Sequence, residues 1–295
     1  MHFRGSYVAL LTPFTGRDEV NVEKLREMVE FQIENGTDGL VPCGTTGESP
    51  TLSWEEHKLV VRTVVEAARK RVQVIAGAGS NNTREAVEAT RFAREVGADA
   101  ALIVNPYYNK PTQEGLYQHF KAIAEQGGLP IVIYNILGRT AINVETSTLV
   151  RLKGVANIQG IKEASGNLNQ ISDVIRLCGD AMDVLSGDDS LTLPLLSVGG
   201  TGVVSVAANI VPREVKALCE SWFMGDAKAA LAMHRKLFPL CQALFLETNP
   251  IPVREAMNLL DWKTGAARLP LTPLSEKNRA LLEVEMKAFG LKVKG

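Results

Sequence analysis

The sequence is poor in the features that mark several large classes of protein. Only four of its 295 residues are cysteine, and no two of them form a CxxC pair, so neither a disulfide framework nor a cysteine-bound metal is expected. Lysine and arginine number 32 against 33 aspartate and glutamate residues, and the net charge is −1, which argues against nucleic acid or a membrane surface as a partner. We expect reduced, mostly buried thiols at Cys43, Cys178, Cys219 and Cys241.

Long hydrophobic runs are also missing. No stretch approaches the roughly 18 to 20 apolar residues that span a bilayer. The apolar run SYVALL, residues 6–11, is followed at once by the turn pair Thr12-Pro13, so we interpret it as the first strand of the fold rather than as a targeting segment. With a pI near 6.5 and unpaired cysteines, this pattern predicts a cytoplasmic enzyme that acts on small molecules and needs neither a metal nor a cofactor.

Short β-rich runs alternate with longer amphipathic segments along most of the chain. Strict alternation predicts a parallel sheet, and eight such units in about 225 residues match a (β/α)8 TIM barrel. A doubly wound open sheet is the alternative, but it favours a glycine-rich dinucleotide turn, and GAGSNN has Asn82 where the third glycine belongs. The strand candidates are residues 6–11, 38–42, 72–77, 100–104, 130–135, 157–162, 182–187 and 201–206.

The strand pattern stops near residue 225. Three helical segments follow, AKAALAMHRKLFPLCQALF, VREAMNLLDW and EKNRALLEVEMKAFG, and the proline-rich turn NPIPVR at residues 249–254 connects them internally. We therefore predict an α/β catalytic barrel over residues 1–225 and a C-terminal three-helix domain over residues 226–295.

Lys162 stands at the carboxyl end of a predicted strand, where barrel enzymes place their chemistry. By the strand period of two, Ile158, Gly160 and Lys162 share one face, so the amine is expected to point into the barrel mouth. Burial there favours the neutral amine, which attacks a carbonyl to form a Schiff base. The alternative is an ion pair with Glu163 or Asp188 at the rim.

Three further groups lie at or past predicted strand ends. GTTGE, residues 44–48, can aim backbone N–H groups and hydroxyls at an anion, and because it lacks a P-loop lysine we expect a carboxylate there; an ordinary turn-rich loop is the alternative. The phenol of Tyr134 can transfer a proton during the reaction. The alternative is a core tyrosine whose hydroxyl group is simply hydrogen-bonded. Arg139 offers a fork for a second carboxylate, unless it is one of many unremarkable loop arginines. This inventory indicates class I aldolase chemistry on keto acids.

The same segments carry the motifs of a known family. The sequence resembles the dihydrodipicolinate synthase family, also called 4-hydroxy-tetrahydrodipicolinate synthase, over nearly its whole length and in family order. The matching motifs are GTTGE (44–48), NPYYNKPTQEGLYQHF (105–120), YNxxGRT (134–140), GIKEASG (160–166), SGDD (186–189) and NPIPVR (249–254).

The resemblance implies a role for each matched position. Lys162 would form the imine with pyruvate, and Thr46 with Thr45 would hold the pyruvate carboxylate. Thr45, Tyr134 and Tyr108 would relay protons, with Tyr108 reaching into the active site of a neighbouring subunit across a tight dimer interface. The implied reaction is the condensation of pyruvate with L-aspartate 4-semialdehyde in the diaminopimelate route to lysine, in a homotetramer built as a dimer of dimers.

The resemblance also assigns Arg139 to the semialdehyde carboxylate, and main-chain groups of Gly187 and Val204 to the wall of the site. One departure stands at Leu137, where the family usually has proline, so the loop that places Arg139 is expected to be freer.

Two alternative functions remain open: another pyruvate-dependent aldolase or keto-acid lyase, and a catalytically silent barrel with a binding or regulatory role.

Feedback control by L-lysine is a further implication of the resemblance. In the regulated members lysine binds at a dimer interface, and an acidic side chain such as Glu85 is suited to its ammonium groups. The alternative is that Trp54 and His57 merely form the first turn of a helix capped by Ser53. The matching positions are Ser49, Trp54, His57, Asn81, Glu85 and Tyr107.

Overall fold

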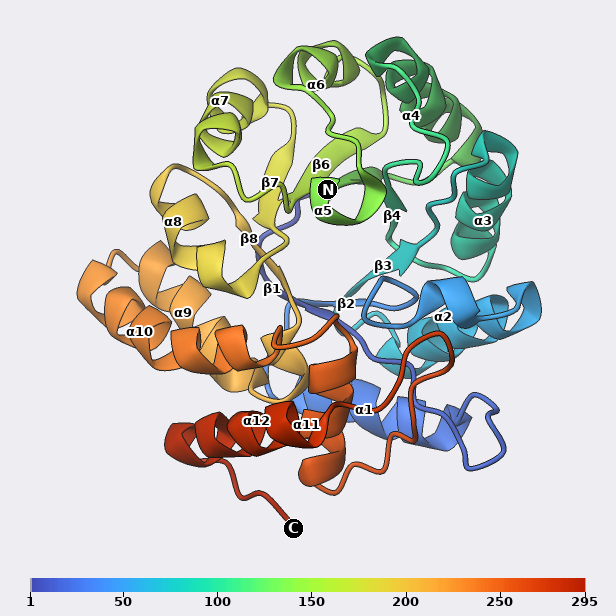
Figure 1. Ribbon diagram of the computed structural model, residues 1–295. Coiled ribbons are helices and arrows are strands. Elements are labelled where there is room, and N and C mark those ends of the chain that lie inside the picture. The colour runs from blue at the N-terminus through green and yellow to red at the C-terminus, as the bar shows by residue number, and fades with distance from the viewer. Residues whose placement is uncertain (1, 295) are drawn as a thin grey trace.

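The computed structural model describes residues 2–294. Eight parallel strands close into a barrel in sequence order, with β8 paired to β1, and helices surround it (Figure 1). The predicted (β/α)8 architecture is confirmed, and the alternative of an open, doubly wound sheet is wrong. The strands are β1 Gly5–Ala9, β2 Gly39–Val41, β3 Gln73–Gly77, β4 Ala100–Val104, β5 Ile131–Asn135, β6 Ile158–Glu163, β7 Asp183–Ser186 and β8 Gly202–Ser205.

The strands are buried on both sides, as expected for a parallel sheet that helices cover. Alternate strand residues point inward and, together with Phe3 from the segment before β1, form a small inner cluster. Its strand members are Tyr7, Ala9, Val41, Ile75, Ala100, Leu102, Val132, Tyr134, Leu185 and Val204. The intervening residues join a larger outer cluster between the sheet and the helices. The barrel is therefore a packed core, and its carboxyl end supplies the site.

In strand β6, the residues that face the interior of the barrel differ in part from the sequence prediction. A Cβ placed on Gly160 would lie 3.1 Å from Phe3, so Gly160 faces the inner cluster together with Lys162. Ile158 lies in the outer cluster instead, because the register between β5 and β6 shifts just after it and such an irregularity turns the preceding residue to the other face. The predicted shared face is therefore correct for Gly160 and Lys162 and wrong for Ile158.

The helices follow the strands as predicted. A complete capping box at Ser53 and Glu56 begins α2, so Trp54 does start a helix capped by Ser53. The helices are α1 Val22–Glu34, α2 Trp54–Ala68, α3 Thr83–Glu95, α4 Gln113–Gly127, α5 Leu137–Thr140, α6 Thr146–Leu152, α7 Leu168–Cys178, α8 Thr192–Ser197, α9 Pro212–Phe223, α10 Ala227–Ala243, α11 Ile251–Leu259 and α12 Glu276–Phe289.

The last three helices cover one side of the barrel. In Figure 1, α10 lies beside α9, α12 packs against α10, and α11 packs against α12, in orange to red. The predicted helical segments after residue 225 therefore form helices, whereas the domain boundary itself stays a prediction.

All four cysteines are buried and unpaired. Within residues 2–294, none of the helices combines the length and the apolar character that crossing a membrane requires.

Candidate active site

Lys162 and Tyr134 face each other on neighbouring strands. They are register partners of β6 and β5, each side chain is about 5% exposed, and the Lys162 Nζ lies 4.0 Å from the centroid of the Tyr134 ring. Among residues 2–294, Lys162 has no carboxylate oxygen within 4.0 Å of Nζ. The predicted alternative of a rim ion pair is therefore wrong, and the amine stands next to a phenol at the mouth of the barrel.

Glu163, the expected ion-pair partner, points to the opposite side of β6. Its carboxylate accepts hydrogen bonds from the Asn135 side chain at 3.1 and 3.3 Å and from the Ser165 N–H at 2.7 Å. Burial raises the pKa of Glu163 above its usual value, although these donors partly oppose the shift. Asn105 extends the network through a 2.9 Å hydrogen bond to Asn135. The sequence analysis assigned no role to this buried polar network.

Gly187 provides the space that Lys162 occupies. A Cβ at this position would lie 3.0 Å from Lys162 Cε and 2.7 Å from Ala164 Cβ, which leaves no room for a larger residue. The Gly187 N–H donates to the Glu163 carbonyl at 2.8 Å. Val204 is buried in the inner cluster. Both residues therefore lie at the carboxyl end of the barrel, as their predicted positions require.

The loop GTTGE follows β2 and is held tightly. The Glu48 N–H donates to the Thr45 carbonyl at 3.1 Å, and Glu48 has a left-handed φ of +54°. Thr45 lines the cavity at the mouth of the barrel, whereas Thr46 is buried and accepts a 3.1 Å hydrogen bond from the Asn249 side chain. The loop therefore places one hydroxyl in the cavity and ties the other to the C-terminal part of the chain.

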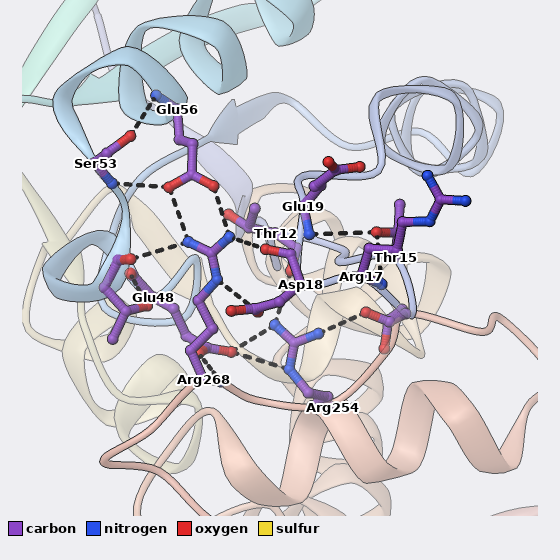
Figure 2. A network of polar contacts seen from close by, with 12 residues as sticks. Thr12, Thr15, Arg17, Asp18, Glu19, Glu48, Ser53, Glu56, Arg254 and Arg268 are labelled. Atoms are coloured by element: carbon purple, nitrogen blue, oxygen red, sulfur yellow. Dashed lines mark hydrogen bonds and ion pairs between the residues drawn. The ribbon is translucent and has the colours of Figure 1, made fainter.

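Glu48 does not belong to an anion cradle. It forms a fully buried ion pair with Arg254, whose Nε and Nη2 lie 3.0 and 2.5 Å from Glu48 Oε1 (Figure 2). Arg254 also donates to the carbonyls of Thr12 and Thr264 at 2.7 Å each. Sequence reasoning missed this pair, although both residues lie in motifs that it had singled out. The sequence feature that could have indicated this buried ion pair is the arginine in the apolar segment NPIPVR.

Arg139 lies on the short helix α5 after β5. Its Nη2 donates to the main-chain carbonyl of Asn249 at 2.9 Å, and it lines the cavity. Leu137 is the first residue of α5 and is half-exposed; a proline is tolerated at that position too. The turn closes through the Arg139 N–H, which donates to the Ile136 carbonyl at 3.2 Å, so leucine is compatible with the turn that holds Arg139.

One cavity of about 690 Å³ is lined by residues from both predicted sites, although Lys162, Thr46, Gly187 and Val204 are not among them. Asn81 is not part of its wall, but its side chain donates to the Tyr107 carbonyl at 3.1 Å. Burial lowers the pKa of His57 to about 4, and its Nδ1 has no hydrogen-bond partner among the described residues. The residues that line the cavity include Thr45, Tyr134 and Arg139 from the predicted active site and Ser49, Trp54, His57, Glu85 and Tyr107 from the predicted lysine site.

Tyr108 does not reach this cavity. Its side chain is 92% exposed in the single chain, and its backbone has a left-handed φ of +73°. The neighbouring Tyr107 lines the cavity instead. A role for Tyr108 in proton transfer therefore requires a second chain, as the sequence analysis supposed, and it stays a prediction.

The comparisons with known proteins point to one family. Residues 2–289 match the model of the dihydrodipicolinate synthetase family. The 4-hydroxy-tetrahydrodipicolinate synthase of Geotalea uraniireducens (strain Rf4) is 53% identical over 98% of this chain and 99% of its own length.

Two solved structures have nearly the same fold. The chloride-inhibited dihydrodipicolinate synthase of Acinetobacter baumannii, complexed with pyruvate, is 44% identical with a TM-score of 0.97. The enzyme of Cyanidioschyzon merolae with lysine bound is 43% identical with a TM-score of 0.95. Each alignment covers 99% of this chain and all of the other.

These relatives confirm the predicted activity, that of 4-hydroxy-tetrahydrodipicolinate synthase, and the predicted enzyme class, a lyase of the class I aldolase type. None of these relatives supports the alternative that the chain is a catalytically silent barrel. By the match of its family model and by its identity to these enzymes, the chain belongs to the dihydrodipicolinate synthetase family.

Proposed function

We propose that the synthase activity of this chain proceeds through a Schiff base on Lys162. The observation that carries the proposal is a buried lysine amine that has no carboxylate partner among residues 2–294 and lies 4.0 Å from the ring of Tyr134 at the carboxyl end of the barrel. Such an amine attacks the keto carbon of pyruvate, and the keto oxygen leaves as water to give the imine. Tyr134, which faces Lys162, lines one cavity together with Thr45, and these two residues are assigned the proton transfers of this step.

The second half of the reaction uses the acidity of the imine. Loss of a proton from the pyruvate methyl group gives an enamine, which attacks the aldehyde carbon of L-aspartate 4-semialdehyde. The amino group of the semialdehyde then adds to the imine carbon, closes the ring and displaces Lys162 as the free amine. Holding both substrates in one cavity makes these steps intramolecular, which is a large part of the rate enhancement.

Two groups are assigned to the two substrate carboxylates. Thr46 with Thr45 receives the carboxylate of pyruvate, and Arg139 receives that of the semialdehyde through its guanidinium fork. Within residues 2–294 the guanidinium of Arg139 donates one hydrogen bond, to the Asn249 carbonyl, so further guanidinium N–H donors remain for a ligand. Gly187 and Val204 form the wall beside the imine.

The assembly is also a proposal. We infer a homotetramer built as a dimer of dimers, in which Tyr108 completes the proton relay of the neighbouring subunit. Its almost complete exposure in the single chain leaves the side chain accessible to a second chain, as this assignment requires. Four unpaired, buried cysteines support a reducing compartment, and we propose the cytoplasm.

We further propose that L-lysine binds beside the active site and inhibits the enzyme. Glu85 lies in the wall of the cavity and offers a carboxylate to an ammonium group. His57 also lies in this wall, and Trp54, stacked on His57 with centroids 5.3 Å apart, offers an apolar face to the methylene chain. Ser49, Asn81 and Tyr107 complete the proposed site.

Borohydride reduction in the presence of pyruvate tests the proposed chemistry. Intact-protein mass spectrometry is expected to show one pyruvyl adduct per chain, and peptide mapping is expected to place it on Lys162. The adduct should vanish in Lys162→Ala and persist in Lys110→Ala, a matched control at an exposed lysine past another strand end. An unmodified wild-type chain would contradict the Schiff-base mechanism.

A further inference from the structure

Asn249 joins the two groups that are assigned to the substrate carboxylates. Its side-chain Nδ2 donates to Thr46 Oγ1 at 3.1 Å, and its main-chain carbonyl accepts from Arg139 Nη2 at 2.9 Å. Asn249 itself is only 5% exposed. A single residue of the C-terminal segment therefore contacts both halves of the proposed substrate site, although it was not among the predicted site residues.

The direction of the hydrogen bond to Thr46 has a chemical consequence. A hydroxyl group has one proton to donate and two lone pairs that accept. When Asn249 donates to Thr46, one lone pair is used and the hydroxyl proton of Thr46 stays available for an anion. A carboxylate at position 249 would instead accept that proton, and it would also repel a substrate carboxylate bound beside it.

The segment that carries Asn249 is fixed against the same loop at a second point. Arg254 N–H donates to the Pro250 carbonyl at 2.9 Å, and the Arg254 side chain forms the buried ion pair with Glu48, two residues after Thr46 (Figure 2). The Arg268 N–H adds a 3.0 Å hydrogen bond to Glu48 Oε2. These contacts attach the segment that carries Asn249 to the loop that carries Thr46.

We propose that Asn249 is a positioning residue for both substrates: its amide orients the Thr46 hydroxyl toward the pyruvate carboxylate, while its carbonyl holds Arg139 for the second substrate. The proposal rests on the proposed function, since it takes Thr46 and Arg139 as the two carboxylate-binding groups. It assigns different tasks to two parts of one residue, and these parts respond differently to substitution.

The isosteric variant Asn249→Asp separates the two tasks. It keeps the size of the side chain and the main-chain carbonyl but replaces the donor by an anionic acceptor. We expect the pyruvate concentration needed for half-maximal trapping on Lys162 to rise about tenfold or more, with a much smaller change in the KM for the semialdehyde. The control Asn167→Asp adds the same charge at the exposed N-cap of α7 and should leave both values unchanged.

A purely structural role gives a different pattern. Loosening of the segment would displace the carbonyl that holds Arg139, so the KM values for both substrates would rise together. If Asn249→Asp does not fold, Asn249→Ala removes the donor without adding charge and is expected to raise the pyruvate requirement by about threefold to tenfold.

The outcomes distinguish this inference from the proposed function. If wild-type protein shows no adduct on Lys162, the proposed function fails. If wild type is trapped normally and neither variant changes the pyruvate dependence, or if both KM values rise equally, the positioning role of Asn249 is wrong while the Schiff-base mechanism stands.

Discussion

Lys162 and Glu163 are neighbours in β6, but their side chains lie on opposite sides of the strand. The side chain of Lys162 enters the mouth of the barrel, whereas Glu163 turns outward to Asn135 and Ser165. Because the carboxylate is hydrogen-bonded elsewhere, it forms no salt bridge with the amine of Lys162. Gly187 then leaves the space in which the lysine side chain lies. The reactivity proposed for Lys162 therefore depends on these neighbouring residues as well as on the lysine itself.

A prediction at this scale concerns Glu85. Isothermal calorimetry with L-lysine is expected to give binding heat for the wild type, and saturating lysine should reduce turnover. Glu85→Gln should weaken lysine binding about tenfold or more, because it removes the charge that faces an ammonium group, and it should leave the KM for pyruvate unchanged.

The matched control for this test is Glu95→Gln, which makes the same change at the other end of α3. It should bind lysine like the wild type. Absence of both binding heat and inhibition in the wild type would refute the lysine proposal, and equal lysine affinity in wild type and Glu85→Gln would remove Glu85 from the site.

Elements far apart in the sequence meet at the loop after β2. The buried pair between Glu48 and Arg254 joins positions 206 residues apart. A second pair, between Arg268 and Glu56, connects the turn before α12 to the first turn of α2, with distances of 2.6 and 2.9 Å (Figure 2). The side chain of Arg268 lowers the pKa of Glu56 to about 2. These pairs attach the C-terminal helices to the loop that carries Thr45 and Thr46.

Arg254→Met is expected to lower the free energy of unfolding by about 3 to 5 kcal/mol, because it leaves the Glu48 carboxylate buried without its partner. Urea unfolding followed by circular dichroism at a fixed protein concentration measures the change. Combining it with Glu48→Gln should recover part of the loss, since no unpaired charge then remains.

Arg279→Met provides the comparison for this prediction. Arg279 pairs with Glu255 at 2.7 Å but is 42% exposed, so its loss should cost about 1 kcal/mol or less. A similar cost for the two arginine variants would show that the buried pair contributes no more than a surface pair.

At the scale of the whole molecule, the site of one chain is incomplete if Tyr108 acts in proton transfer. Lys162, Tyr134 and Arg139 gather at the mouth of a single barrel, while Tyr108 stands outside it and is exposed. The proposed dimer brings this tyrosine to the barrel of the partner subunit. Activity then depends on assembly, and not only on the fold of each chain.

Subunit complementation tests this arrangement. Lys162→Ala and Tyr108→Phe are each expected to be nearly inactive. In a mixed dimer one site has both residues intact and the other has neither, so random mixing should restore about one quarter of the wild-type activity. Co-expression with two affinity tags and a turnover assay would measure the recovery.

The control pairs Lys162→Ala with Arg139→Ala. Both residues lie in the site of one chain, so mixing should restore nothing. If the Tyr108 mixture also stays inactive, Tyr108 does not act across an interface. Light scattering in the same samples should give about four times the 32.0 kDa of one chain if the proposed tetramer forms.

The sequence by itself determined the order of the eight strands and the place of Lys162 at a strand end. Local periodicity is enough for both, because it reports how each segment is buried. The predicted strand ends are close to the observed ones: for example, residues 100–104 were predicted and Ala100–Val104 is observed. The motifs of the family also named Thr45, Tyr134 and Arg139, which line one cavity.

Only the tertiary structure decided the remaining features. The register shift in β6 that turns Ile158 outward depends on pairing with β5, and no pattern within a single strand encodes it. The pairing of Glu48 with Arg254 and the bridge through Asn249 depend on contacts across more than a hundred residues of chain. Periodicity describes how a residue relates to its near neighbours in the chain, whereas burial of a charge requires partners that only folding brings together.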